Sequence, residues 1–132
     1  GFDITAVNSE TLQSFPIQIK TSNGGALVHS VIDKWVEHRI EDDNSQYLGD
    51  LLELPNPNKI WIMVQLKGNT LSSARYFICT EAQIQEKIVT RYRNFMEKHN
   101  YRRPGGGAST QAILNVKDVP EFEDNWNILD GY

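Results

Sequence analysis

Two short segments of alternating polarity near the start of the chain constrain its fold more than any other feature. Residues 1–7 and 15–21 alternate apolar with polar side chains, and residues 8–14 between them are rich in turn formers. Alternation with a period of two is typical of β-strands that bury one face, and two such strands around a short polar loop predict a β-hairpin. The chain therefore begins with a sheet rather than a helix.

The register of this hairpin decides which polar side chains meet. A loop centred between Thr11 and Leu12 would place Asp3 directly opposite Lys20, with Cβ atoms about 5 Å apart. Gln18 lies two residues before Lys20 and therefore shares its face of the strand. We expect Asp3, Gln18 and Lys20 to project together from an otherwise apolar hairpin.

Further strands are predicted in the second half of the chain. Residues 59–67 are rich in β-branched and aromatic side chains and are followed by a Gly-Asn turn. Residues 75–80 form a second apolar run, and the short connection predicts that the two strands pair antiparallel. Residues 111–116 read as one more strand, after a flexible glycine-rich loop.

Two helices are predicted from apolar periodicity. The first begins at Ser30 with Asp33 in the capping-box position and extends to residue 40; its apolar stripe is Val31, Ile32, Trp35, Val36 and Ile40. The second follows a capping box of Thr80 and Gln83, and its apolar stripe is Ile84, Ile88, Tyr92, Phe95 and Met96. This spacing makes Phe95 a core residue rather than a platform for stacked bases. The three tryptophans are expected to anchor the core: Trp35, Trp61 and Trp126.

The length of the chain indicates one domain. Its 132 residues, 39% of them hydrophobic, suffice for one core. Residues 41–58 read as an insertion between core elements, and residues 118–132 as an acidic C-terminal tail. The single cysteine, Cys79, excludes an internal disulfide, and the longest apolar run is far shorter than the roughly 20 residues of a membrane span. We expect a cytoplasmic protein that does not associate with membranes.

Charge is strongly segregated, although the formal net charge is only −4. Residues 1–58 carry three basic and nine acidic side chains, residues 59–103 nine basic and three acidic, and residues 104–132 one basic and five acidic. A local basic patch attracts a phosphate backbone whatever the net charge of the protein. The alternative is a solvated helix face with no partner. The candidate phosphate contacts on and after the second helix are Lys87, Arg91, Lys98, Arg102 and Arg103.

The hairpin offers the groups that phosphodiester hydrolysis requires. A hard cation neutralises charge on the phosphate, and oxygen ligands hold that cation. Asp3 can supply a carboxylate oxygen, Gln18 an amide oxygen and Ile19 a main-chain carbonyl. Lys20, beside them, can orient the attacking water and stabilise developing negative charge.

These residues resemble a known family. The sequences GFDI at residues 1–4 and IQIKT at residues 17–21 are similar to the core motif of the PD-(D/E)XK nuclease superfamily, in the variant with Gln before x-Lys that is familiar from Mrr-like type IV restriction enzymes. The strands and the long helix that follow are similar as well, so the resemblance extends over most of the chain.

The resemblance implies an α/β fold of the restriction endonuclease-like type, with a mixed central β-sheet flanked by α-helices. It implies cleavage of DNA with Mg²⁺ or Mn²⁺, held by Asp3, Gln18 and Ile19, and makes Lys20 the catalytic lysine. Many proteins of this fold cut DNA as dimers, so the resemblance also makes a homodimer one expected form of this chain.

The chain departs from the family pattern in its acidic residues. Position 18 is Gln, and the sequence begins two residues before Asp3, where the family usually has a further helix and strand. Either the chain is a fragment of a longer protein or the domain lacks its N-terminal helix. Asp33 or Glu37 is a candidate for a second carboxylate, and the alternative for both is a solvated acidic face. An alternative is therefore a catalytically inactive copy of the fold that binds DNA or a protein. A third is an interaction domain without a nucleic-acid partner, which would use the acidic 37–53 segment or the tail.

Overall fold

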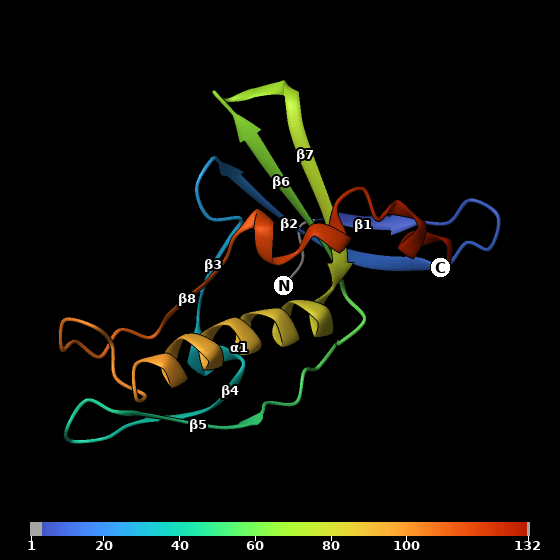
Figure 1. Cartoon of the computed structure of the whole chain (residues 1–132). Helices are drawn as coiled ribbons and strands as arrows, with labels where there is room; N and C mark the ends of the chain where they lie inside the picture. Colours follow the sequence, from blue (N-terminus) through green and yellow to red (C-terminus); the bar gives the residue numbers. More distant parts are fainter. Residues whose placement is uncertain (1–3, 132) are drawn as a thin grey trace.

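Residues 4–131 are described by a computed structural model in which strands predominate. The described residues form an α/β protein with three β-sheets and a single α-helix, α1 (Glu81–Lys98). The strands are β1 (Ile4–Val7), β2 (Ser14–Asn23), β3 (Val28–Val31), β4 (Val36–Ile40), β5 (Gln46–Leu51), β6 (Ile60–Lys67), β7 (Thr70–Thr80) and β8 (Gln111–Leu114). Figure 1 shows the largest sheet above α1 and the β4–β5 hairpin below it.

The largest sheet has the strand order β1-β2-β6-β7 and is mixed. The pairs β1–β2 and β6–β7 are antiparallel, whereas β2 and β6 at the centre run parallel. Parallel neighbours need a long crossover connection, and the segment between β2 and β6 supplies one. The antiparallel β6–β7 pair confirms the prediction from the strand pattern, and the sheet is mixed, as the resemblance implied.

The β1–β2 hairpin is present, but its register differs from the predicted one by two residues. Ile4 faces Ile17, whereas a loop centred between Thr11 and Leu12 would place it opposite Ile19. The loop is tighter than expected because the Asn8 side chain accepts hydrogen bonds from the backbone N–H groups of residues 10 and 11. Asp3 lies outside the described residues. Lys20 lies beyond the residues of β2 that pair with β1 in the described part of the chain. Its neighbour on the adjacent strand β6 is Met63.

The helix predicted over residues 30–40 is wrong. This segment forms the end of β3, a single 3-10 turn η1 (Ile32–Lys34) and then β4. β3 pairs with β8, and β4 pairs with β5, which lies within the 41–58 segment. Pairing with strands distant in the sequence therefore outweighs the local helical periodicity.

The second helix is confirmed with its capping box. The Thr80 hydroxyl accepts a hydrogen bond from the backbone N–H of Gln83 at 3.2 Å, and the Gln83 side chain accepts one from the backbone N–H of Thr80 at 2.9 Å. Ile84, Ile88, Tyr92 and Met96 are buried as predicted. Phe95 is not a core residue: it is 38% exposed. Because α1 is the only α-helix among residues 4–131, the expectation of a sheet flanked by several helices is also wrong.

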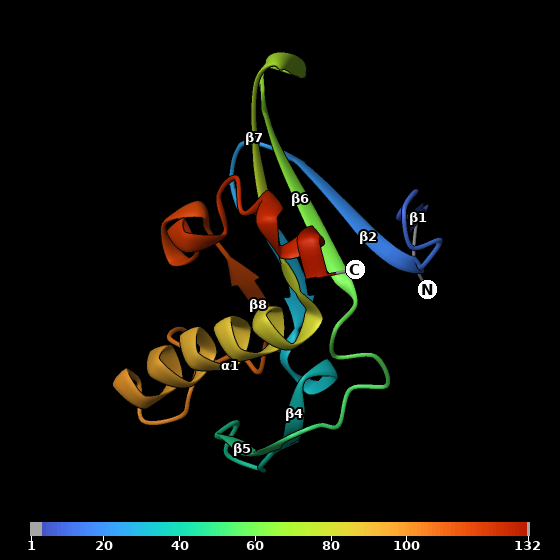
Figure 2. The same cartoon turned by 90° about the vertical axis from the view of Figure 1, so that its right-hand side faces the viewer.

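The hydrophobic core has two parts, one on each face of the large sheet. The larger part contains Trp61, Met63, Phe77 and Cys79, which face α1, and it includes Trp35. Burial raises the pKa of the Cys79 thiol far above its ordinary value, as expected for a packed cysteine. Figure 2 shows how α1 and β8 lie together beside the sheet.

The C-terminal segment contacts both parts of the core: Val119 and Phe122 belong to the larger part, and its last turn packs on the smaller part. Residues 116–131 form three 3-10 turns, η2 (Val116–Asp118), η3 (Pro120–Phe122) and η4 (Trp126–Gly131). Ile128 and Leu129 of η4 contact the smaller apolar cluster around Ile17, Ile60 and Ile78. Trp126 is 42% exposed and contacts Tyr76, so its predicted role as a core anchor is wrong, whereas Trp35 and Trp61 are buried.

A buried polar group ties the β4–β5 hairpin to α1. The Gln46 side chain, 3% exposed, accepts a hydrogen bond from the Tyr92 hydroxyl and donates one to the Ser109 carbonyl at 2.9 Å. His38 lies 2.9 Å from the same Gln46 carbonyl oxygen. Burial raises the pKa of Tyr92, so this hydroxyl remains a donor at neutral pH.

No helix in residues 4–131 combines the length and the apolar character that crossing a bilayer requires.

Truncating the centre of the core tests this description. Phe77→Ala removes a fully buried ring between β7 and α1, and we expect it to lower the free energy of unfolding by about 3–5 kcal/mol in urea denaturation. Leu71→Ala is the control, because Leu71 is 74% exposed, and its effect should stay within about 0.5 kcal/mol. Equal effects of the two substitutions would contradict the assigned core.

Candidate functional site

Gln18 and Lys20 lie on the face of β2 that is turned toward the larger core. In the parallel register, Gln18 is beside Trp61 and Lys20 is beside Met63, and both of these neighbours are buried. Lys20 itself is exposed, and its Nζ lies 5.7 Å from the centre of the Trp61 ring. The two predicted residues therefore share one side of the sheet, as their spacing requires.

A second lysine converges on the same tryptophan from η1. The Lys34 Nζ lies 5.0 Å from the Trp35 ring centre and 5.9 Å from that of Trp61. Aromatic faces attract cations, which explains why both ammonium groups settle over these rings. Sequence reasoning missed Lys34 because it assigned residues 30–40 to a helix, and no local signal points from Lys34 to Lys20.

We call these two lysines, whose ammonium groups lie 5.7 and 5.9 Å from the Trp61 ring centre, the lysine pair (Lys20 and Lys34). Neither makes an ion pair with a carboxylate of residues 4–131. The indole N–H of Trp61 beneath them is buried and has no hydrogen-bond partner in this part of the chain. Buried donors without partners cost stability and are few in native proteins. The lysine pair is thus suited to an anion that would lie against both ammonium groups.

Two of the three ligands predicted for a hard cation lie within the described residues. The Gln18 amide oxygen and the Ile19 carbonyl oxygen are ligands of the type that Mg²⁺ accepts. The carboxylate of the predicted set belongs to Asp3, which lies outside the described residues. Between residues 4 and 131, no three His, Cys, Asp or Glu side chains are grouped so that they could hold a metal ion.

The two alternative carboxylates lie on different elements. Asp33 is part of η1, next to Lys34 in the sequence. Glu37 belongs to β4, and its side chain lies so close to Gly49 of β5 that a Cβ added to this glycine would be 2.9 Å from the Glu37 Oε2. The β4–β5 sheet is separate from the sheet that contains Gln18.

Two of the predicted phosphate contacts are paired with acidic residues that follow β8. Lys87 lies 2.5 Å from a Glu121 oxygen, and Arg91 lies 3.0 Å from an Asp118 oxygen. Arg91 also donates a hydrogen bond to the Ile113 carbonyl at 3.2 Å. The acidic tail folds back onto the basic helix, so part of the positive charge of the helix is neutralised by ion pairs.

Arg103 is held against the C-terminal half of α1. Its guanidinium donates a hydrogen bond to the Ser109 carbonyl at 3.1 Å and lies 5.0 and 5.4 Å from the ring centres of Tyr92 and Phe95. Lys98 makes no ion pair with any residue in the 4–131 range. Lys98 is therefore the most available of the predicted phosphate contacts.

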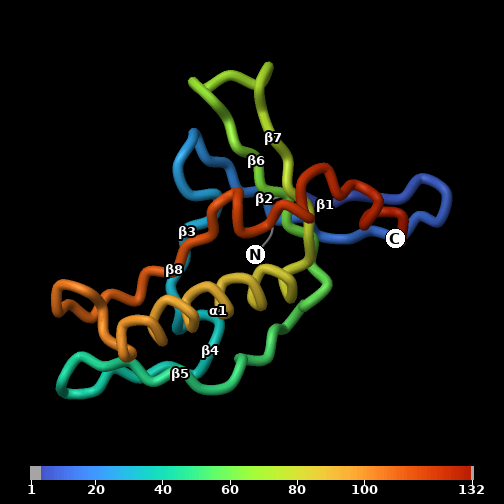
Figure 3. Tube along the Cα trace, in the orientation of Figure 1, coloured from blue at the N-terminus to red at the C-terminus, as the bar shows by residue number. Residues whose placement is uncertain are grey.

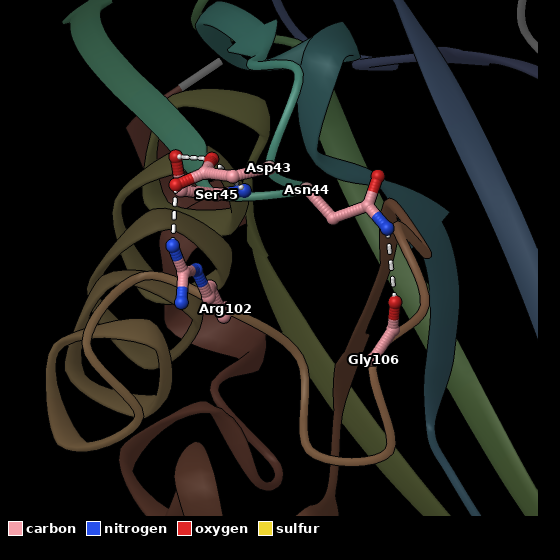
Figure 4. Close-up of polar contacts among 5 residues, drawn as sticks. All are labelled: Asp43, Asn44, Ser45, Arg102 and Gly106. Atoms are coloured by element: carbon pink, nitrogen blue, oxygen red, sulfur yellow. Dashed lines mark hydrogen bonds and ion pairs between the residues drawn. The ribbon is translucent and has the colours of Figure 1, made fainter.

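Arg102 joins two loops that are far apart in the sequence. It forms an ion pair with Asp43, and the Asn44 side chain donates a hydrogen bond to the Gly106 carbonyl at 3.0 Å (Figure 4). Figure 3 shows the two loops side by side, one after β4 and the other before β8. The Arg102 guanidinium thus connects parts of the fold, in addition to any role toward a ligand.

The carboxylate of Asp43 is stabilised in its charged form. The Ser45 hydroxyl donates a hydrogen bond to it at 2.6 Å and the Ser45 backbone N–H donates one at 2.9 Å (Figure 4). These bonds, followed by that from Arg102, hold the pKa of Asp43 well below its ordinary value of 3.8. The stabilisation is present above the ordinary pKa and is lost as the pH falls toward the lowered one.

No protein-family model matches this chain, and no curated protein or solved structure is detectably similar to it.

The contacts of Asp43 predict which of two substitutions changes the pKa of its carboxyl group more. Ser45→Ala should raise the pKa of Asp43 more than Arg102→Gln does, because the serine hydroxyl makes the larger contribution. An NMR titration of the Asp43 carboxyl carbon in the three proteins measures this order. A pKa of Asp43 that is unchanged by Ser45→Ala would contradict the assignment.

Proposed function

We propose that this chain is a metal-dependent nuclease domain of the restriction endonuclease-like type, which hydrolyses DNA phosphodiester bonds. The observation that carries the proposal is the lysine pair, of which Lys20 shares a face of β2 with Gln18 and Lys34 approaches from η1. Two ammonium groups without acidic partners in the described residues attract a phosphate, and Gln18 adds an oxygen ligand beside them. The mixed sheet with a parallel central pair agrees with the fold that the sequence resembles.

The roles of the residues follow from their chemistry. Lys20 orients the attacking water and opposes the negative charge that develops on the phosphate. Lys34, which approaches the same Trp61 ring, adds a second positive charge that attracts the phosphate. Asp3, Gln18 and Ile19 are the residues that would hold Mg²⁺ or Mn²⁺, and the cation when bound supplies Lewis-acid stabilisation of the phosphate.

A second candidate function is an inactive domain of the same type that binds DNA without cutting it. The observation that favours it is Gln18, because an amide oxygen lacks the negative charge of a carboxylate and holds a divalent cation less tightly. Both functions use the lysine pair to bind phosphate, so they differ only in turnover.

Substitution of Lys20 separates the two functions. We expect the unmodified chain with Mn²⁺ to cleave at least one member of a panel of plasmid, linear, single-stranded and branched DNA. Lys20→Ala should lower the cleavage rate by about 100-fold or more, since it removes a group that stabilises the transition state. Lys67→Ala is the matched control, because Lys67 is an exposed lysine at the end of β6.

Full activity of Lys20→Ala would exclude the proposed catalytic lysine. Absence of cleavage by the unmodified chain, together with retained binding to DNA, would favour the inactive domain.

Lys34 should contribute to binding rather than to the chemical step. Lys34→Gln removes one contact to phosphate, so the slope of log K against log salt concentration should become shallower by about 0.9 in a DNA-binding titration. Lys67→Gln should leave the slope unchanged. An unaltered salt dependence of Lys34→Gln would show that this lysine does not contact the DNA backbone.

A further inference from the structure

Two adjoining cavities follow the exposed side of α1. The first, of about 210 Å³, lies between α1 and β8, which are in contact in Figure 2. The second, of about 370 Å³, continues along α1 toward η2. Arg91 and Phe95 line both cavities, so the two form one continuous surface, which we call the α1 groove.

The α1 groove is positively charged. Among the described residues that line its two cavities, the charged side chains are Lys87, Arg91, Lys98, Arg103 and Asp118. Four of these five are cations, but Arg91 is paired with Asp118, and Lys87 is paired with Glu121 beside the groove. Lys98 and Arg103 therefore carry the net positive charge among the described lining residues, and an occupant that complements this surface must carry negative charge.

Phe95 gives the α1 groove an aromatic surface between these cations. It is 38% exposed, although its helical position places it next to the buried Met96 and one turn after the buried Tyr92. The Arg103 guanidinium lies 5.4 Å from its ring centre and the His99 ring lies 4.6 Å from it. The ring is thus held in place by its neighbours while it lines both cavities.

We propose that the α1 groove binds a single-stranded nucleic acid, with one unpaired base stacked on Phe95 and the adjacent phosphates on Lys98 and the neighbouring cations. Base stacking on an aromatic ring beside basic residues is the general way in which proteins hold single strands. A paired base inside a duplex has both faces covered and cannot reach Phe95. An acidic peptide would form ion pairs with the cations, but its carboxylates would not stack on the Phe95 ring.

This inference rests on the proposed function, since it names the form of nucleic acid that the domain takes. Binding is measured by fluorescence anisotropy on the full chain, without divalent metal so that no cleavage takes place. The probes are labelled oligothymidylate of about 20 nucleotides and a duplex of the same length. The unmodified chain should bind the single strand more tightly than the duplex.

The test substitution is Phe95→Ala, with Phe95→Leu as a second variant that keeps an apolar side chain without an aromatic face. Both should weaken single-strand binding by about tenfold while binding to the duplex changes little. Tyr47→Ala is the matched control: Tyr47 is 45% exposed, and the Arg39 guanidinium lies 4.5 Å from its ring centre on the β4–β5 hairpin. It should bind both probes as the unmodified chain does.

Three results would overturn the proposal: a preference for the duplex, an equal loss in Tyr47→Ala, or single-strand binding by Phe95→Ala that matches the unmodified chain. Displacement of the oligonucleotide by poly-glutamate at equal charge concentration would also overturn it, in favour of an acidic protein partner. Cleavage and binding assays on Lys20→Ala distinguish this inference from the nuclease proposal. Loss of cleavage in Lys20→Ala with single-strand binding unchanged supports the α1 groove as a separate binding surface.

Discussion

The parallel pairing of β2 with β6 is the interaction on which the rest of this structure depends. It places Gln18 beside Trp61 and Lys20 beside Met63, and thereby turns both polar residues toward the larger core. Parallel strands require a long connection, and here that connection contains η1 and brings Lys34 to the same tryptophan. One backbone pairing thus assembles the lysine pair from two distant parts of the chain.

Acidic residues of the chain form ion pairs that hold its elements together, in addition to setting its net charge. Asp118 and Glu121 lie in the turns after β8 and pair with Arg91 and Lys87 of α1. The pKa of Glu121 is lowered, chiefly by its hydrogen bond from Lys87. These pairs are partly exposed, so each adds little stability by itself, but together they leave Lys98 as a free cation of the α1 groove within residues 4–131.

In the proposed nuclease, the lysine pair and the α1 groove would divide two tasks. The lysine pair adjoins Gln18 and is suited to act on one phosphate, whereas the α1 groove offers cations spread along a helix together with an exposed ring. Phosphate contacts along a helix position a strand without reading its sequence. In the inactive alternative the groove would keep its role, because none of its residues takes part in the chemistry.

The sequence by itself determined the hairpin, the antiparallel β6–β7 pair and the capped helix α1, because each depends on local alternation, helical periodicity or turn chemistry. The mixed sheet was implied only by the resemblance, because it depends on the pairing of β2 with the distant β6. It also identified Gln18 and Lys20 as neighbours on one face of a strand. Only the tertiary structure decided that residues 30–40 form strands, since their partners β5 and β8 come later in the chain. Three other features could not be predicted from the sequence: the lysine pair, the exposure of Phe95 and the ion pair of Arg102 with Asp43. Each depends on how segments that are distant in the sequence pack together, and no local pattern indicates this.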